Sequence, residues 1–309
     1  MRFSEANRQH QGILADLVEL LTNLLAPFRG SQESPEEWDT MLTLMYPYVE
    51  DARWESAGLA RSVYDTERRK HLGETANAWR AGYEFEWFRE AMEPARVVFS
   101  QEGSPDYAVS RVVMNAAKVV EDGWRRTLID AVRDDPANHE PRPTGSRSPS
   151  RQAVGWARVA TGRETCEFCL TMISRGPVYL SAESAGLRTN DDEAAALWRR
   201  LQGTGEDAQL ADEELDGLMT RWHVNCDCRV VPVFDEDNWP GKAEADKALA
   251  IWNRYTKLVE DNPELMFPNN GNQNVSGRRH WTKNEAIFAA IRRDLESGKI
   301  SMADLAAAA

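Results

Sequence analysis

The chain has 309 residues, a formal net charge of −13 and a pI near 5.0. This length is enough for two or three domains, and the acidity argues against a protein built as a whole to neutralise nucleic-acid phosphate or anionic lipid. The N-terminus lacks the apolar segment of a secretory signal, and no apolar run is long enough for a membrane span. We therefore expect a soluble, cytoplasmically made protein with no membrane association.

The first part of the chain has helical periodicity. Apolar residues recur every three or four positions over residues 13–25, and this stripe stops before Pro27. Ser34, Pro35 and Glu37 then have the spacing of an N-cap, a first-turn proline and a capping-box glutamate. The sequence thus predicts one helix that ends near Pro27 and a second that begins at Pro35.

The helical pattern continues to about residue 133. We expect the second helix to end or kink at Pro47, because proline removes a backbone donor. Further helices are predicted over about 52–69 and 75–92, and a longer one follows Ser104. Together these segments predict an N-terminal helix bundle over residues 1–134.

The composition changes abruptly after the bundle. Residues 135–152 are rich in proline, serine, arginine and glycine, which is typical of a solvated linker. Residues 153–235 then carry two strand-like segments, at 155–160 and 229–234. A very acidic, helical insert over 190–217 interrupts this small module, and we expect it to be a solvated face.

Residues 236–309 form the last predicted region, a helical C-terminal extension. Amphipathic helices are expected over about 243–262 and 283–297. Between residues 277 and 299 the charge balance turns positive, which permits contact with packaged DNA. Acidic residues interrupt this stretch, however, so a mixed-charge surface is the favoured interpretation.

All four cysteines of the chain belong to one sequence pattern. Cys166 and Cys169 form a Cys-x-x-Cys knuckle, and His223, Cys226 and Cys228 form a distant His-x-x-Cys-x-Cys. Thiolates and imidazole are the ligands that Zn²⁺ prefers, and a tetrahedral structural site needs four of the five. The pattern predicts one structural zinc ion that joins two distant segments.

The identity of the fourth ligand stays open at this level. Both members of the knuckle and Cys226 belong to every metal interpretation. His223 lies three residues before Cys226, one turn away in a helix, whereas Cys228 would share a face with Cys226 in an extended strand. The fourth ligand is therefore His223 or Cys228.

The same cysteines could serve other chemistry. Disulfides would suit a secreted chain, a thioredoxin-like pair leaves two cysteines unexplained, and a zinc deaminase needs a His-x-Glu that is absent upstream. A thiol hydrolase would use Cys166 or Cys169 as nucleophile and His223 as base. Zinc is favoured because a nucleophile explains one cysteine and a metal explains four.

The middle region also carries further motifs. The segments Ala157–Gly162 and Ser174–Tyr179, the knuckle and the run from His223 to Phe234 together resemble the Mu F-like minor head proteins of tailed bacteriophages, in the form common among actinobacterial phages. The resemblance covers about residues 1–235 in layout. The acidic insert departs from the family pattern, and the tail after about residue 235 has no match.

The resemblance implies a structural minor capsid protein that acts in head assembly at or near the portal vertex, in the virion head. The implied partners are the portal protein and the major capsid or scaffolding protein. Some members of that family are fused to, or named as, a capsid maturation protease. No second domain with a Ser/His/Asp layout is visible here, so a non-enzymatic role leads, and a capsid maturation protease or cysteine-dependent hydrolase is the alternative.

The predicted fold class is therefore α+β and predominantly helical. It comprises an N-terminal helix bundle, a linker, a small zinc-stapled α+β module of Mu F-like type and a helical C-terminal tail. The module has few apolar residues for its size once the polar insert is set aside. A bound metal that contributes on the order of 10 kcal/mol or more to folding would decide whether it is stable.

Overall fold

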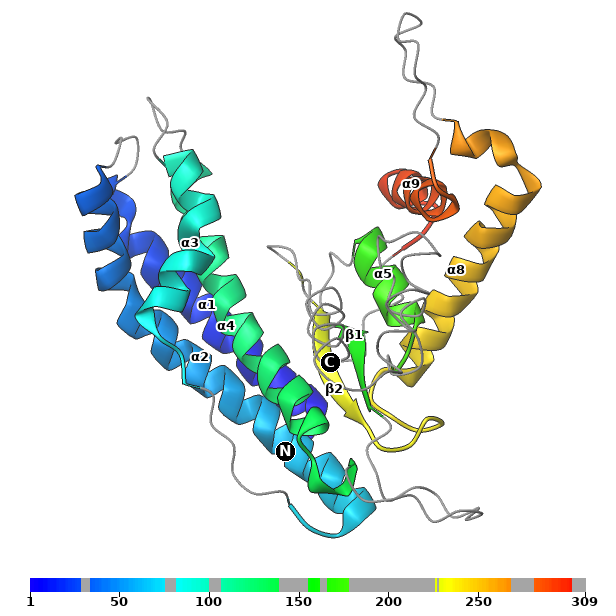
Figure 1. Ribbon diagram of the computed structural model, residues 1–309, viewed down its shortest axis with the longest axis horizontal. Coiled ribbons are helices and arrows are strands. Elements are labelled where there is room, and N and C mark those ends of the chain that lie inside the picture. The colour runs from blue at the N-terminus through cyan, green and yellow to red at the C-terminus, as the bar shows by residue number, and fades with distance from the viewer. Residues whose placement is uncertain are drawn as a thin grey trace, which may run out of the picture.

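The structure is a computed structural model (Figure 1). It describes residues 1–28, 34–75, 82–99, 107–138, 155–161, 166–177, 226, 228–267 and 281–301. These segments are mostly helical and contain one two-stranded sheet, which confirms the predicted fold class. None of the helices in this part of the chain has the length and apolarity that crossing a membrane requires.

Four long helices form the N-terminal bundle and run alongside one another (Figure 1). They are α1 (Phe3–Leu24), α2 (Pro35–Leu72), α3 (Phe85–Phe99) and α4 (Tyr107–Arg133), and a short 3-10 turn, η1 (Ala26–Phe28), follows α1. The predicted helix start at Pro35 is confirmed. The Ser34 hydroxyl accepts a hydrogen bond from the Glu37 N–H, and the Glu37 carboxylate accepts one from the Ser34 N–H.

Two boundaries differ from those expected. Helix α2 does not end at Pro47 but continues to Leu72, because buried Met45 and Val49 keep the apolar face continuous on both sides of the proline. Packing of that face outweighs the loss of one backbone hydrogen bond. Helix α3 begins ten residues later than expected, at Phe85, where the stripe of buried residues starts: Phe88, Met92, Ala95 and Phe99.

The buried apolar residues divide into two clusters along the bundle. The distal cluster is built by α1–α4 alone and includes Leu17, Leu21, Trp38, Met45, Phe88, Phe99, Val112 and Val120. The proximal cluster joins the other end of the bundle to the described strands and helices that follow it, and includes Phe3, Val63, Tyr64, Trp124, Leu128, Trp156, Val230, Trp252 and Ile287. The proximal core is therefore shared between the bundle and the C-terminal half.

The sheet pairs two strands that are distant in sequence. Strand β1 (Gly155–Ala160) runs antiparallel to β2 (Cys228–Val233), with Gly155 opposite Val233 and Ala160 opposite Cys228. Every residue of both strands is buried. Helix α4 covers one face of this sheet, and α5 (Glu167–Ser174) lies on the other (Figure 1). Both strands were expected from the sequence, β2 beginning one residue earlier than predicted.

The C-terminal helices complete the second layer. Helix α8 (Lys242–Asp261) packs along α5, and α9 (Lys283–Glu296) contacts both, after the 3-10 turn η4 (Pro263–Met266) (Figure 1). At the start of α8, Gly241 adopts a φ of +92°, and a Cβ there would lie 2.1 Å from the Val159 Cγ1 of β1. Glycine is thus what permits α8 to approach the sheet.

The predicted linker begins with an anchored residue. Asp135 is buried and accepts hydrogen bonds from Arg68, at 2.7 Å, and from the Tyr64 hydroxyl. A 3-10 turn, η2 (Pro136–Asn138), follows it. The solvated character expected for residues 135–152 therefore does not hold at Asp135. Residues 139–152 and the insert at 190–217 lie outside the described residues.

Candidate metal centre

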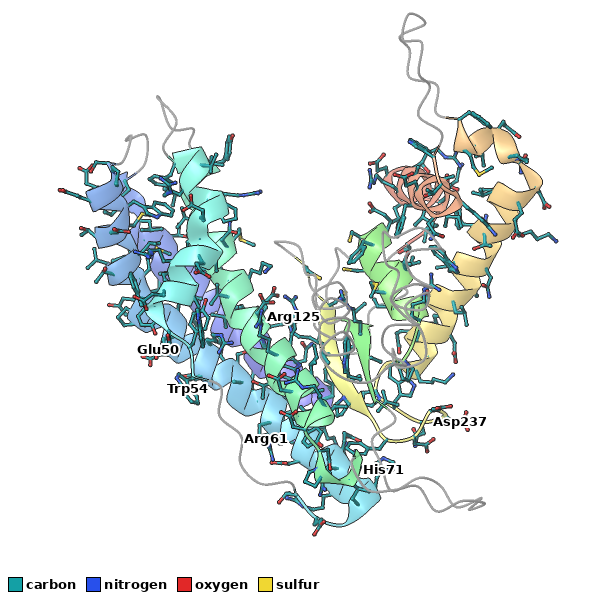
Figure 2. All side chains as sticks on the ribbon, in the orientation of Figure 1. Glu50, Trp54, Arg61, His71, Arg125 and Asp237 are labelled. Atoms are coloured by element: carbon teal, nitrogen blue, oxygen red, sulfur yellow. The ribbon has the colours of Figure 1, made fainter. Side chains whose placement is uncertain are left out.

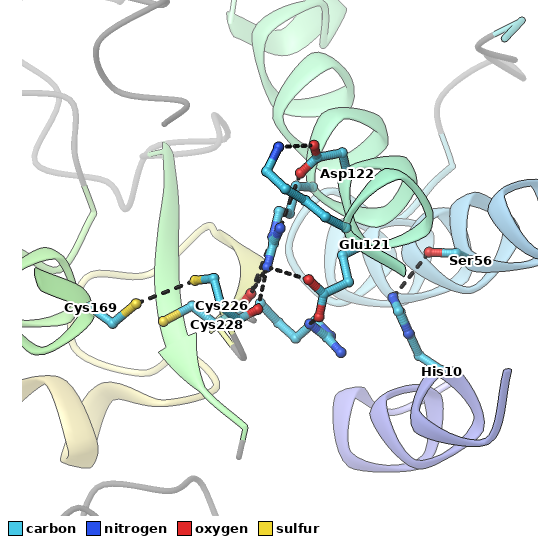
Figure 3. Close-up of polar contacts among 10 residues, drawn as sticks. His10, Ser56, Glu121, Asp122, Cys169, Cys226 and Cys228 are labelled. Carbon is cyan, nitrogen blue, oxygen red and sulfur yellow. Dashed lines mark hydrogen bonds and ion pairs between the residues drawn. The ribbon is translucent and has the colours of Figure 1, made fainter. Parts of the chain in front are cut away.

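The thiols from the two predicted ligand segments meet beside the sheet. Cys166 is the N-cap of α5, Cys169 lies in its first turn, and Cys228 opens β2. The Sγ atoms of Cys169, Cys226 and Cys228 all lie within 4.8 Å of one another, and all three residues are buried (Figure 3). Segments separated by more than fifty residues thus bring their sulfurs together, as the sequence pattern required.

The spacing of the sulfurs suits a shared ion. The Cys169 and Cys226 Sγ atoms are 3.3 Å apart, which is too long for a disulfide, and all four cysteines are free. Around a tetrahedral Zn²⁺ with bonds of about 2.3 Å, ligand sulfurs lie about 3.8 Å apart. A small outward movement of the side chains would therefore admit the ion. Among the described residues, the donors grouped here are soft thiols, which also fits zinc.

The fourth thiol lies next to this group. The Cys166 Sγ accepts a hydrogen bond from the Cys169 N–H at 3.4 Å, and the two side chains are also hydrogen-bonded. Of the two candidates for the remaining ligand, the structure brings Cys228 into the group. His223 lies outside the described residues, and ligation by any of the five residues stays a prediction.

Hydrogen bonds among the thiols shift the pKa values of Cys226 and Cys169 in opposite directions. Bonds with Cys169 and Cys228 lower the pKa of the Cys226 thiol, with a further contribution from the Arg125 charge. Bonds with Cys166, Cys226 and Cys228 raise the pKa of the Cys169 thiol. Binding of a divalent cation would require the ligand thiols to lose their protons.

Arg125 of α4 holds the ligand segment from the other side of β2. Its guanidinium donates to the carbonyl oxygens of Cys226, at 2.7 Å, and Cys228, at 3.2 Å (Figure 3). The side chain extends from the face of α4 that is turned toward the sheet (Figure 2). It also pairs with Glu121 and Asp122. Burial works against its charged form, yet Glu121 and Cys226 raise its pKa.

Arg158 of β1 supplies a second buried guanidinium. Arg158 pairs with Val230 and Ala160 with Cys228 in the antiparallel register, so Arg158 and Cys228 project from the same face of the sheet. The Arg158 side chain is completely buried and lies 5.8 Å from the centre of the Phe168 ring on α5. Burial lowers its pKa, and the charges of Cys228, Cys226 and Cys169 oppose that effect.

A polar network continues from this site into the bundle. Glu121 accepts a hydrogen bond from Arg229 of β2 at 3.0 Å as well as one from Arg125. The Trp124 indole N–H donates to the Val230 carbonyl at 2.9 Å. Sequence reasoning missed Arg125 and Arg158 as partners of the cysteines. The available signal was a pair of charged residues, Glu121 and Arg125, on the apolar stripe of α4.

Other titratable residues that could act as acids or bases have structural partners. Buried His10 contacts the Ser56 hydroxyl at 3.1 Å, and burial lowers its pKa (Figure 3). His71 stacks on Phe234. Glu167, the carboxylate next to Cys166, pairs with Arg292 of α9.

The basic stretch of the tail is also neutralised where the structure describes it. Lys283 pairs with Glu260 at 2.5 Å, while Arg293 and Lys299 both pair with Asp294. With the Arg292–Glu167 pair, every one of these four cations has an acidic partner. The described part of residues 277–299 is therefore a mixed-charge surface, as favoured from the sequence.

Comparison with known proteins places the chain in a family. The family described as VG15 protein matches residues 2–257. The chain is 39% identical over 300 residues to the Gene 15 protein of Mycobacterium phage D29, a match that spans 96% of this chain and 100% of that protein. It is 36% identical over 308 residues to the Gene 15 protein of Mycobacterium phage L5, spanning 96% of each. No solved structure matches. The chain therefore belongs to the VG15 protein family, a family of phage proteins.

Proposed function

We propose that this chain is a structural minor capsid protein of Mu F-like type that acts in phage head assembly at or near the portal vertex. In this proposal it holds one structural Zn²⁺ and catalyses no reaction. The observation that carries it is the convergence of three buried thiols from two distant segments, within a chain whose relatives are phage proteins. The Mu F-like motifs of the sequence surround this same cluster.

Zinc is the ion that this donor set favours. Cys169, Cys226 and Cys228 supply three thiolates, and Cys166 is the adjacent candidate for the fourth. A closed tetrahedron of thiolates is typical of sites that stabilise folds, because a catalytic zinc keeps one coordination position for water or substrate. The ion would clamp α5 to β2, two elements of the proximal cluster that are distant in sequence.

Burial argues against Cys169 as a nucleophile, whereas Cys166, the other candidate nucleophile, is partly exposed. Cys169, Cys226 and Cys228 have exposed fractions of 1% or less, so a peptide substrate could not reach their sulfurs without opening the fold. A hydrolase needs an accessible thiolate next to a general base. Among the described residues, Glu167 is engaged by Arg292, and the group around the sulfurs contains cysteines only.

The proposed partners follow from the proposed place of action. The portal protein is the first, and the major capsid or scaffolding protein is the second, with the chain located inside the head or at the portal vertex. The paired cations of α9 give no support to DNA contact through the described tail.

Metal analysis of the purified full-length chain tests the zinc. We expect about one equivalent of zinc per chain, tightly held, with loss of binding in both Cys169→Ser and Cys226→Ser. The hydrolase alternative predicts instead that Cys226→Ser stays folded and cleaves a head protein. A metal-free wild-type chain that melts no differently after zinc is added would refute the structural ion.

Particle composition tests the assembly role. The gene would be removed from its phage, and the heads and portal complexes formed during infection would be purified with and without complementation. We expect the complemented chain to copurify with portal protein and to be required for normal yields of DNA-filled heads. Normal heads in its absence, or a chain never found with head or portal components, would contradict the proposal.

A further inference from the structure

Helix α2 carries a second apolar stripe, on the side that faces away from the bundle core. The exposed fractions of Leu44, Tyr48 and Trp54 are 48%, 45% and 39%, and exposed Pro47 lies among them. Residues three, four and seven positions apart share one face of a helix, so these four side chains form a single stripe. Trp54 lies on the side of α2 away from the sheet (Figure 2). No other helix in the described part of the chain exposes three large apolar side chains.

This stripe is distinct from the face that α2 buries in its own domain. Met41, Met45 and Val49 of the same turns are completely buried in the distal cluster. Apolar side chains at a spacing of three, four and seven residues are also what one helix uses to dock on another protein. From Leu44 to Trp54 the stripe is about 15 Å long, which is nearly three helical turns. Its length and spacing therefore suit a partner helix.

The charged side chains around the stripe are acidic. From Glu36 to Glu55, α2 contains six carboxylates, and its one cation in that range, Arg53, is buried against Tyr83. Asp51 and Glu55 lie four residues apart on the exposed face, and neither forms an ion pair with a described residue. Like charges at this spacing destabilise a helix. A cation supplied by a partner would relieve that repulsion.

Pro47 adds a hydrogen-bond acceptor to the same turns. Proline has no N–H, so the Thr43 carbonyl lacks the donor that a helix normally places four residues later. The Thr40 and Thr43 hydroxyls already donate to the Glu36 and Asp39 carbonyls, each at 2.8 Å. The carboxylates and the Thr43 carbonyl accept hydrogen bonds and do not donate them. Lysine and arginine side chains are the matching donors.

We propose that α2 docks a cationic amphipathic helix of a partner protein on its outer face, which comprises Leu44, Pro47, Tyr48, Asp51, Trp54 and Glu55. The partner's apolar residues pack on the three exposed apolar side chains. Its lysines or arginines pair with the carboxylates and with the Thr43 carbonyl. That this partner is a protein of the phage head rests on the proposed function, whereas the chemistry of the outer α2 face does not.

The charge of the outer α2 face argues against other occupants. DNA and anionic lipid would be repelled by its carboxylates. A second copy of this chain would bring the same face against itself in a two-fold contact, so that Asp51 and Glu55 would meet carboxylates again. A cationic helix is the occupant that satisfies both the apolar and the acidic groups.

Peptide binding to the full-length chain tests the chemistry. A fluorescein-labelled helical peptide of lysine and leucine would be titrated with the chain and followed by anisotropy, beside a glutamate and leucine peptide with the same apolar pattern. We expect only the lysine peptide to bind, and more weakly as salt is raised. Trp54→Ser should weaken its binding about tenfold or more, and Asp51→Lys should do the same.

Two matched controls carry the same changes elsewhere on the surface. Leu249→Ser removes an exposed leucine from α8, and Asp237→Lys reverses an exposed charge in the loop after β2, far from α2 (Figure 2). Both should bind the lysine peptide within about twofold of wild type. Circular dichroism would show that every variant is folded. No binding of the lysine peptide, equal binding of the glutamate peptide, or losses in the controls as large as in Trp54→Ser would overturn the inference.

Photocrosslinking during phage infection tests the natural occupant. Benzoylphenylalanine would replace Tyr48, or Leu249 as the control position, and the crosslinked peptides would be sequenced by mass spectrometry. We expect Tyr48 alone to capture a segment of another phage protein in which lysines or arginines flank apolar residues at helical spacing. Capture of a second copy of this chain, of an acidic segment, or of nothing would overturn the inference.

The identity of the captured protein separates this inference from the proposed function. A cationic helix from a protein that is absent from heads and portal complexes would support the docking site and contradict the head-assembly role. A head or portal protein captured through an acidic segment would do the reverse.

Discussion

The two ends of the helix bundle are held together in different ways. The distal cluster is closed by α1–α4, so its core is built from residues within one continuous third of the chain. The proximal cluster is completed by β1, β2, α5, α8 and α9. Helix periodicity is enough to build the first, whereas the second exists only when segments far apart in sequence meet.

Polar contacts reinforce that difference at the proximal end. The Trp124 and Val230 partners are 106 residues apart, and Arg125 and Cys226 are 101 apart. Contacts of this separation form only after a long chain segment has been ordered. We therefore expect the stability of the proximal end to depend on the proposed zinc ion.

Removal of the metal should produce the largest effect. Chelation, or Cys169→Ser, should destabilise the proximal end by on the order of 10 kcal/mol, because a structural zinc contributes that much to folding. Hydrogen exchange followed by mass spectrometry should detect lost protection in β1 and β2, with protection kept around Met45 and Phe88 of the distal cluster. Added zinc should reverse the effect of the chelator. An equal loss of hydrogen-exchange protection in the distal and proximal clusters would contradict the proposal that only the proximal end depends on the ion.

Gly241→Ala should have the next largest effect. Its Cβ would lie 2.1 Å from Val159 Cγ1, at a φ of +92°, so α8 would be pushed from the sheet. We expect a loss of about 2–5 kcal/mol in urea unfolding. Gly73→Ala is the control, with a φ of +81° and open space, and should cost about 1–2 kcal/mol. Equal losses of unfolding free energy in Gly241→Ala and Gly73→Ala would refute the close approach of α8 to Val159.

Gly123→Ala should disturb the crossing of α2 and α4. The new Cβ would lie 2.7 Å from Arg53 Cγ and 2.9 Å from the Arg53 carbonyl oxygen, and the backbone cannot easily move. Thermal unfolding should give a loss of about 1–3 kcal/mol. Exposed Gly58 of α2 has open space, so Gly58→Ala should stabilise by about 0.5–1 kcal/mol. A stabilising Gly123→Ala would show that the helices are not in contact there.

The smallest loss of stability should come from removing the hydrogen bond between Tyr255 of α8 and Asp294 of α9. The Tyr255 hydroxyl donates to Asp294 at 2.7 Å; this bond, with Arg293 and Lys299, lowers the pKa of Asp294 to about 2. The stabilisation is therefore present above the unfolded pKa of about 3.9 and is lost as the pH falls toward 2. Asp294→Asn should cost about 1–2 kcal/mol at pH 6.

Unfolding of that variant should be followed from pH 6 to pH 2. Its difference from wild type should narrow over the acidic part of this range, because wild type loses the charged bond there. Asp246→Asn removes an exposed pair with Lys242 and should cost under about 1 kcal/mol. A difference between wild type and Asp294→Asn that stayed constant down to pH 2 would contradict the assigned bond.

The sequence-based predictions succeeded where local chemistry decides the structure. The capping box of Ser34 and Glu37 and both strands follow from spacing and residue type. The helix did not end at Pro47, one of the two outcomes expected there, because burial of Met45 and Val49 outweighs the local penalty of proline. That comparison depends on tertiary packing, which a local pattern does not contain.

The site was predictable in part for the same reason. Cysteine spacing predicted that the two segments would meet, and the structure brings Cys169, Cys226 and Cys228 together. The arginines were not predictable, because Arg125 acts on backbone carbonyls and Arg158 depends on strand register. Neither contacts to backbone carbonyls nor strand register can be recognised from a sequence motif. Buried charge on an apolar stripe was the only hint.

Helix α4 recognises β2 largely through main-chain oxygens, and this has an evolutionary consequence. Trp124 and Arg125 donate to the carbonyls of residues 226, 228 and 230, which every amino acid provides. Val230 can therefore be substituted while the hydrogen bonds from helix α4 to the strand are kept. Divergent relatives can retain this docking geometry with little resemblance along the strand itself, provided that the two donors persist.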